Sequence, residues 1–228
     1  MYRKDMYIWK KSKPWNYDWD NPSMAEKKSP SAFTRNIFLI RTAHWDTTIP
    51  KYNVSTKVKF LTPLGQYQAA CTGKRLQHLN LNFSKIYHSR LFRAEETSAC
   101  IEASLTKVPV AITTLLDDSD PPPEPFIPSL EYIQEDCPIP EKRLNFAFNK
   151  FFNRPSSSAT SDSYEIMVTH AAVIRYFMCK LLQIKPGAGK MLSLPHASIT
   201  WVEIHGDGTV RIKRVGECGH ILPDKVTV

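Results

Sequence analysis

Two short apolar runs, each closed by polar residues, dominate the pattern of this chain. Residues 37–40 read Ile-Phe-Leu-Ile and end on Arg41, and residues 166–168 read Ile-Met-Val and are followed by Thr169 and His170. Continuous apolar runs of this kind predict strands that are buried on both faces. Because α/β folds bind their ligands at the carboxyl ends of such strands, these two ends are candidate sites. The simpler alternative is that each polar residue is only the solvated end of a core strand.

The rest of the pattern alternates strands with helices. Thr62 and Pro63 indicate a helix start, because Thr is a favoured N-cap and Pro a favoured first helical residue. The stretch from His205 to Gly208 is a turn signal that predicts a β-hairpin. This order predicts an α/β fold, a three-layer sandwich with a mainly parallel sheet. Further strands are expected at 84–88, 111–116, 198–204 and 209–215, and helices at 63–79, 90–106, 171–182 and 129–153, the last at least over 141–152.

Three of these strand ends and helix starts carry cationic or imidazole side chains. They are Arg41, Arg93 and His170. Arg offers paired donors that match the geometry of a phosphate, and helix N-termini add backbone donors. Two guanidiniums and an imidazole around one point therefore predict a site for a doubly charged phosphoryl group.

The chain divides into a polar arm and one domain. Residues 1–33 are expected to be a flexible arm, with Lys27 to Ser31 as its linker, and residues 34–228 to be the domain. Trp15 and Trp19 stand out in the arm, and large aromatic side chains in a polar stretch need burial somewhere. They predict a partner-binding segment. The alternative is that these aromatics fold back onto the domain of the same chain.

The charge of the chain favours anionic partners. Its 228 residues carry 30 Lys and Arg against 22 Asp and Glu, a formal net charge of +8. Phosphoproteins or an anionic membrane surface fit this excess, whereas the basic and aromatic pattern typical of a nucleic-acid module does not occur. The five cysteines are scattered and form no C-x-x-C pair, which favours a reducing compartment. No apolar run approaches the roughly 18 residues of a membrane span, and no signal segment is expected.

Six stretches together resemble one known family. They are NIFLIR (36–41), LTPLGQYQA (61–69), YHSRLFRAEET (87–97), DSYEIMVTHAAVIRY (162–176), LSLPHASIT (192–200) and LPDKVT (222–227). In this order they resemble the histidine phosphatase (phosphoglycerate mutase-like) superfamily, and within it the mitochondrial serine/threonine-protein phosphatases. The resemblance covers nearly all of residues 34–228. It implies a phosphoglycerate mutase-like fold, with phosphate held by Arg41, Arg93 and His170.

The resemblance also implies catalytic roles, and at one of them this chain departs from the family. A carboxylate after the strand at 111–116 serves the family as proton donor, which implies Asp118, with Asp117 as its neighbour; the alternative is that these residues are a solvated acidic loop. The family's nucleophile is a histidine directly after the first arginine, where this chain has Thr42. An imidazole attacks phosphorus readily near neutral pH, whereas a threonine hydroxyl needs a strong adjacent base. Thr42 is therefore a poor chemical substitute.

His44 is the nearest histidine that could replace the missing nucleophile. In an extended chain, residues two apart point to the same face but lie roughly 6–7 Å from each other. This displacement is large against a near-attack distance of about 3–3.5 Å. The expectation is that His44 is a loop histidine with a water partner.

These observations predict a serine/threonine-phosphatase-like protein that binds a phosphoprotein substrate or client and is catalytically impaired, a pseudophosphatase. The alternative is an active phosphomonoester hydrolase with residual or altered chemistry. A mutase is disfavoured, because it must hold the phosphoryl group on the missing histidine. No cofactor and no metal is expected.

The resemblance further implies a location and a partner. The location is the mitochondrial outer membrane surface, with the cytoplasm as the alternative. The segment Trp15 to Asp20 is similar to the assembly motif of the resembled phosphatases, although Asn16 and Asp18 depart from it. Trp15 and Trp19 are therefore expected to mediate self-association, or association with a related active phosphatase.

Overall fold

The computed structural model describes residues 14–46, 60–118 and 141–228 and shows a six-stranded mixed sheet. The strand order is β3-β2-β4-β1-β5-β6, and the first four strands in this order run parallel while β5 and β6 are antiparallel to their neighbours. The mainly parallel sheet of the prediction is confirmed. The strands are β1 (Thr34–Arg41), β2 (Phe83–Ser89), β3 (Val110–Thr113), β4 (Ser163–Thr169), β5 (Ile199–His205) and β6 (Val210–Glu217).

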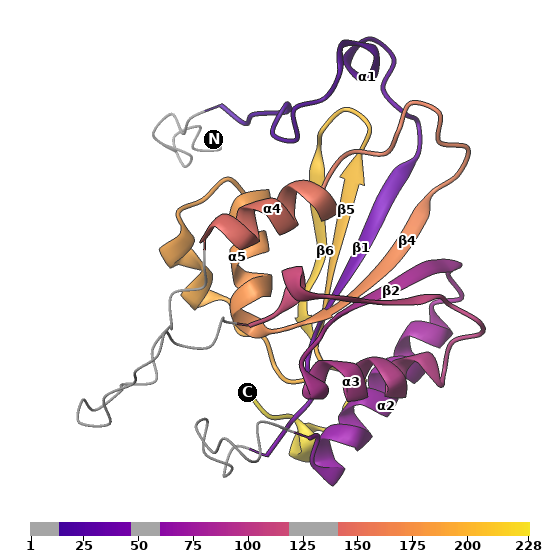
Figure 1. Cartoon of the computed structure of the whole chain (residues 1–228), viewed down its shortest axis with the longest axis vertical. Coiled ribbons are helices and arrows are strands. Elements are labelled where there is room, and N and C mark those ends of the chain that lie inside the picture. The colour runs from indigo at the N-terminus through magenta and orange to yellow at the C-terminus, as the bar shows by residue number, and fades with distance from the viewer. Residues whose placement is uncertain (1–13, 47–59, 119–140) are drawn as a thin grey trace, which may run out of the picture.

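Helices cover both faces of the sheet, which makes the three layers (Figure 1). In this view α4 and α5 lie to the left of the sheet, and α2 and α3 lie at the lower right. Residues 37–40 of β1 are fully buried and alternate between two cores, as a strand covered on both faces requires. The helices are α2 (Pro63–His78), α3 (Phe92–Glu102), α4 (Glu141–Phe151) and α5 (Ala171–Leu181). Ile37 and Leu39 join the core of α4 and α5, while Phe38 and Ile40 join that of α2 and α3.

Some predicted boundaries hold and others do not. Thr62 caps α2 as predicted, since its side chain accepts from the Gly65 N–H. The helix expected at 90–106 is shorter, since α3 runs from Phe92 to Glu102 and the Leu105 N–H then donates to the Glu102 carbonyl in an i→i+3 turn that follows the helix. The strand expected at 111–116 ends at residue 113 and becomes the 3-10 turn η1 (Thr114–Leu116). Residues 129–140 lie outside the described residues.

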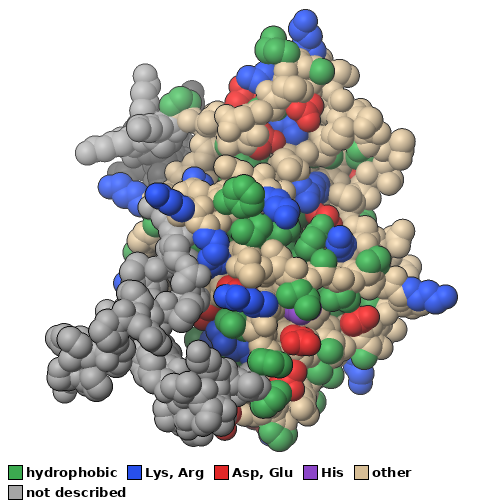
Figure 2. Space-filling view, in the orientation of Figure 1, with side chains coloured by type: hydrophobic (Ala, Val, Ile, Leu, Met, Phe, Trp, Pro, Cys, Tyr) green, Lys and Arg blue, Asp and Glu red, His purple; other side chains and the backbone are tan. Residues whose placement is uncertain are grey.

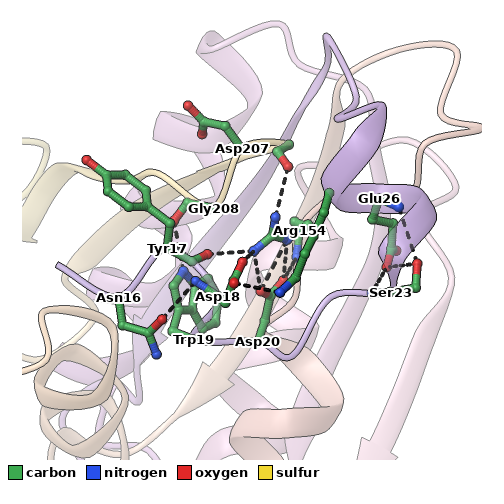
Figure 3. A network of polar contacts seen from close by, with 12 residues as sticks. Asn16, Tyr17, Asp18, Trp19, Asp20, Ser23, Glu26, Arg154, Asp207 and Gly208 are labelled. Atoms are coloured by element: carbon green, nitrogen blue, oxygen red, sulfur yellow. Dashed lines mark hydrogen bonds and ion pairs between the residues drawn. The ribbon is translucent and has the colours of Figure 1, made fainter.

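Part of the arm is folded against the domain (Figure 3). Trp19 packs tilted on Phe148 of α4 with ring centroids 5.7 Å apart, and its indole N–H donates to the Gly208 carbonyl at 2.8 Å. Gly208 has φ +85, and a Cβ there would meet the Tyr17 carbonyl oxygen at 2.0 Å, so this contact requires glycine. The described contacts of Trp19 thus match the alternative in which the aromatics fold back. The partner-binding role of Trp15 and Trp19 stays a prediction.

A buried ion pair holds the same segment. The side chains of Arg154 and Asp20 are 4% and 2% exposed, and Arg154 Nη2 lies 2.7 Å from Asp20 Oδ1. The Arg154 guanidinium also donates to the Tyr17 and Gly206 carbonyls at 2.6 and 3.3 Å. Arg154 opens the serine-rich stretch 154–163, where the local sequence gives no sign that a charged side chain is buried. This ion pair joins the arm to the domain.

The end of the expected arm also forms a short helix, α1 (Met24–Lys28), started by a capping box between Ser23 and Glu26. The linker expected from Lys27 to Ser31 is therefore partly helical. Among the described residues, no helix is long and apolar enough to cross a membrane. Lys and Arg side chains are spread over the face shown in Figure 2, with carboxylates between some of them, so on that face the net charge is not gathered into one patch.

Candidate functional site

The carboxyl ends of β1 and β4 form the floor of the candidate site, at the lower end of the sheet in Figure 1. Arg41 and Thr169 are paired in the parallel register of these strands, and the Thr42 N–H donates to the Thr169 carbonyl at 2.8 Å. His170 follows as the N-cap residue of α5. The Ala43 N–H donates to the Thr97 hydroxyl of α3 at 3.1 Å, which connects these strand ends to the helix that carries Arg93.

A carboxylate joins two of the predicted site residues. Arg93 Nη2 donates to Asp118 Oδ2 at 3.0 Å, and the same oxygen lies 4.0 Å from His170 Nδ1. The Arg93 side chain is 11% exposed, whereas that of Asp118 is 39% exposed. The structure therefore brings Arg93, His170 and Asp118 together, with Asp118 on the open side.

Asp117 and Asp118 have different environments, which separates their roles. Asp117 is 2% exposed and accepts bonds from the Ser89 hydroxyl at 2.8 Å and from the Arg90 backbone and side chain at 3.0 and 2.5 Å. These bonds fix Asp117 in the turn after β3. Asp118 lies beside His170 and is the more exposed of the two carboxylates.

His170 is a neutral imidazole at neutral pH. Burial, followed by the charge of Arg93, lowers its pKa to about 3 against the opposing charge of Asp118. His170 Nε2 lies 3.0 Å from the Ser89 hydroxyl, which gives its own proton to Asp117. His170 Nε2 therefore carries the ring proton, and Nδ1 faces Asp118 as an acceptor. A phosphate dianion in the site would favour the protonated ring, because an opposite charge raises the pKa of an imidazole.

Arg41 is fixed by the chain's C-terminal segment. One Nη donates to the Leu194 carbonyl and the other lies 2.9 Å from His196 Nε2. Since a guanidinium only donates, His196 Nε2 accepts, and its Nδ1–H donates to the Thr227 hydroxyl at 2.9 Å. Burial, followed by the charge of Arg41, lowers the pKa of His196 to about 3, so this tautomer persists. Burial and the charge of Arg175 also lower the pKa of Arg41 to about 10, which still leaves the guanidinium charged.

His196 and Thr227 are site residues that the sequence analysis missed. Both lie in stretches that it matched to the family, LSLPHASIT and LPDKVT. Their contact joins residues 31 positions apart, and the bond to Arg41 spans 155 positions. The sequence could have pointed to both residues only through their position in the matched stretches. The hydrogen bonds that connect them to Arg41 form between segments far apart in the sequence, so the structure is needed to find them.

Thr42 occupies the expected nucleophile position, and His44 lies two residues after it. Thr42 is 2% exposed, and its hydroxyl forms no hydrogen bond with another residue of the described part of the chain. His44 Nδ1 lies 2.8 Å from the Thr62 hydroxyl, and the His44 ring packs edge-on against His196 with centroids 5.4 Å apart. The partner of His44 is therefore Thr62, where the sequence analysis expected water.

Comparisons with known proteins show the family of the chain. The model of the histidine phosphatase superfamily (branch 1) matches residues 37–121 and 148–217. The mitochondrial serine/threonine-protein phosphatase Pgam5 of Caenorhabditis elegans is 35% identical over 209 residues, which cover 90% of this chain and 70% of that protein. The chain belongs to the histidine phosphatase superfamily. The protein of the same name from Homo sapiens is 39% identical over 201 residues, which cover 85% of this chain and 66% of that protein.

Two solved structures share the fold. The phosphoglycerate mutase of Plasmodium falciparum superposes with a TM-score of 0.58 at 26% identity, covering 82% of this chain and 92% of that chain. YhfR of Bacillus stearothermophilus gives a TM-score of 0.63 at 18% identity, covering 82% and 100%. The superfamily and the phosphoglycerate mutase-like fold expected from the sequence are thus confirmed.

The superfamily match places the candidate site within its boundaries. Arg41, Thr42, Arg93, Asp118 and His170 all lie inside the matched ranges. Both Pgam5 relatives are named mitochondrial. Among the residues that the structure describes, no group of three or more His, Cys, Asp or Glu side chains could hold a metal ion.

Proposed function

We propose that this chain binds phosphorylated serine or threonine side chains of a protein client and hydrolyses them poorly or not at all. Arg41, Arg93 and His170 are the ligands of the phosphoryl group in this proposal, and Asp118 is the proton donor that remains. The homology to serine/threonine-protein phosphatases supports the class of client. The alignments span 66–70% of the length of those relatives.

The observation that carries the proposal is the isolation of the Thr42 hydroxyl. A hydroxyl nucleophile is activated by a base within hydrogen-bond reach, and within the described residues the Thr42 hydroxyl has no such base. The His170 lone pair is on Nδ1, which faces Asp118 Oδ2 at 4.0 Å, and His196 Nε2 accepts from Arg41, so neither imidazole lone pair serves Thr42. Losing a covalent nucleophile costs several orders of magnitude in rate.

An active phosphatase of low turnover is the alternative. The observation that favours it is Asp118, which remains 4.0 Å from His170 and 39% exposed, where a leaving group needs a proton. A water molecule attacking phosphorus directly would need no threonine. Such a protein would turn over a phosphate ester with a rate that Asp118→Asn abolishes and Thr42→Ala leaves unchanged.

Anion binding is tested by calorimetry with sulfate and with a phosphoserine peptide. Arg93→Ala removes a cation that is 11% exposed and bonded to Asp118, so we expect both affinities to fall at least tenfold. Arg211→Ala is the control, because Arg211 is a 65% exposed arginine on the edge strand β6. Equal affinities of wild type and Arg93→Ala would contradict the proposed site.

We also propose that the protein acts in an assembly at the mitochondrial outer membrane surface. The similarity of Trp15 to Asp20 to an assembly motif supports self-association or association with an active relative. Light scattering of wild type and Trp15→Ala, alone and mixed with that relative, tests this role. Wild type that remains monomeric and does not co-elute with the relative would contradict it.

A further inference from the structure

Two large aromatic side chains lie open beside the proposed phosphate site. Phe60 and Phe92 are 51% and 46% exposed, yet their rings contact each other with centroids 5.8 Å apart and a 50° tilt. Phe92 is the first residue of α3 and directly precedes Arg93. Exposed aromatic surface that is gathered in one place marks a binding surface more often than a structural need.

A third aromatic ring connects this pair to the phosphate-binding arginine. The Trp45 ring lies 5.1 Å from Arg93 Cζ, which is within the range of a cation–π contact. Trp45 pairs with Leu61 in an antiparallel bridge, and the Asp46 N–H donates to the Phe60 carbonyl at 3.2 Å. We call Trp45, Phe60 and Phe92 the aromatic rim.

The backbone of the rim is fixed before any ligand arrives. The Leu61 N–H donates to Glu96 Oε2 at 2.5 Å, which fastens the segment carrying Phe60 to α3, the helix that carries Phe92. The Thr62 N–H donates to the His44 carbonyl at 3.1 Å and closes the other side of the bridge. A surface held in this way loses little conformational entropy on binding.

We propose that the aromatic rim binds an apolar side chain within two positions of the phosphorylated residue of a client. This inference rests on the proposed function, because Arg93 must hold the phosphoryl group. An extended peptide rises about 3.3 Å per residue, so a neighbour of the phosphorylated residue reaches the rings that flank Arg93. Glu96, which accepts from the Leu61 N–H, and Asp118, which accepts from Arg93, disfavour acidic neighbours. The rim thus selects among phosphorylated sequences.

The test compares two phosphoserine peptides that differ only in the residues flanking the phosphoserine, leucine and phenylalanine in one and glycine in the other. Fluorescence polarisation should show at least fivefold tighter binding of the apolar peptide to wild type. Phe60→Ala and Phe92→Ala should lose this preference while sulfate affinity stays unchanged. Phe146→Ala is the control, since Phe146 is 63% exposed on α4. If a variant fails to fold, the comparison of the two peptides on the wild type still tests the preference for apolar neighbours.

The outcomes separate this inference from the proposed function. Sulfate binding without a preference between the peptides overturns the rim as a specificity surface and leaves the phosphate site in place. Absence of sulfate and phosphopeptide binding overturns both. Equal binding of the unphosphorylated apolar peptide would show a separate docking surface, and loss of a dimer in Phe92→Ala would show a contact between two copies of the chain. Either result also overturns the inference.

Discussion

Asp20→Ala tests whether the arm is fastened to the domain through Arg154. The substitution removes the carboxylate from a pair whose side chains are 2% and 4% exposed, and leaves the buried guanidinium with the Tyr17 and Gly206 carbonyls. Removing one partner of a buried ion pair costs about 3–5 kcal/mol. Because two carbonyl acceptors remain, we expect the lower end, about 3 kcal/mol of unfolding free energy.

Asp18→Ala is the matched control. The Asp18 carboxylate is 50% exposed and lies 3.9 Å from Arg154, besides its 2.6 Å contact with Lys27. Pairs of this exposure contribute about 0–1 kcal/mol. Urea unfolding followed by tryptophan fluorescence reports both variants, since Trp19 lies in the same segment. A loss of 3 kcal/mol corresponds to a melting temperature about 6–12 °C lower in a chain of this size.

A double-mutant cycle with Arg154→Met separates the pair from its surroundings. We expect Asp20→Ala to cost little once Arg154 is methionine, because no buried charge is then left uncompensated. Asp20→Ala that destabilises no more than Asp18→Ala would refute the reasoning. So would additive costs in the cycle.

Three further outcomes follow from the site. Thr227→Val should weaken sulfate binding about fivefold, because the His196 Nδ1–H then loses its acceptor and His196 no longer holds Arg41 in place. Thr227→Ser keeps the hydroxyl and should bind sulfate like the wild type. Calorimetry measures both affinities, and equal affinities of the two variants would contradict this chain of contacts from Thr227 through His196 to Arg41. In the folded protein the pKa values of His170 and His196 are about 3, below the usual 6.5, so the unfolded chain binds protons first as the pH falls. The contribution of each histidine to the free energy of unfolding is therefore fully present above pH 6.5 and decreases by up to about 1.4 kcal/mol per pH unit toward pH 3. Urea midpoints that stay constant from pH 7 to 5.5 would contradict this prediction. Asp118→Asn should tighten sulfate binding severalfold at pH 7, because a negative charge beside Arg93 and His170 is removed; weaker binding in this variant would oppose the assigned geometry.

The fold was predictable from local patterns where those patterns are physically sufficient. The apolar run 37–40 predicts a strand buried on both faces, and the structure divides it between two cores. Thr62 and Pro63 marked the start of α2 correctly. The start of α3 was missed, because its N-cap Leu91 makes no side-chain hydrogen bond and so leaves no capping signal in the sequence.

Contacts between distant segments were not predictable in this way. Arg154 opens a stretch rich in serine, and its burial depends on Asp20, 134 positions earlier. The His196 tautomer depends on the chain's penultimate residue. The exposed rim is also invisible locally, since Phe60 and Phe92 are ordinary core residues by type and only their position at the edge of the site leaves them open. These features arise from tertiary approach, which composition and periodicity do not encode.

The central claim is that the phosphate site remains while Thr42 removes the covalent step. The most direct measurement is the turnover of a chromogenic phosphate ester by wild type and Thr42→His, side by side at pH 7. We predict turnover near background for wild type and at least a tenfold gain for the variant, about 1.4 kcal/mol of barrier. A wild type that turns over like an ordinary phosphatase, or a variant that gains nothing, would contradict the account.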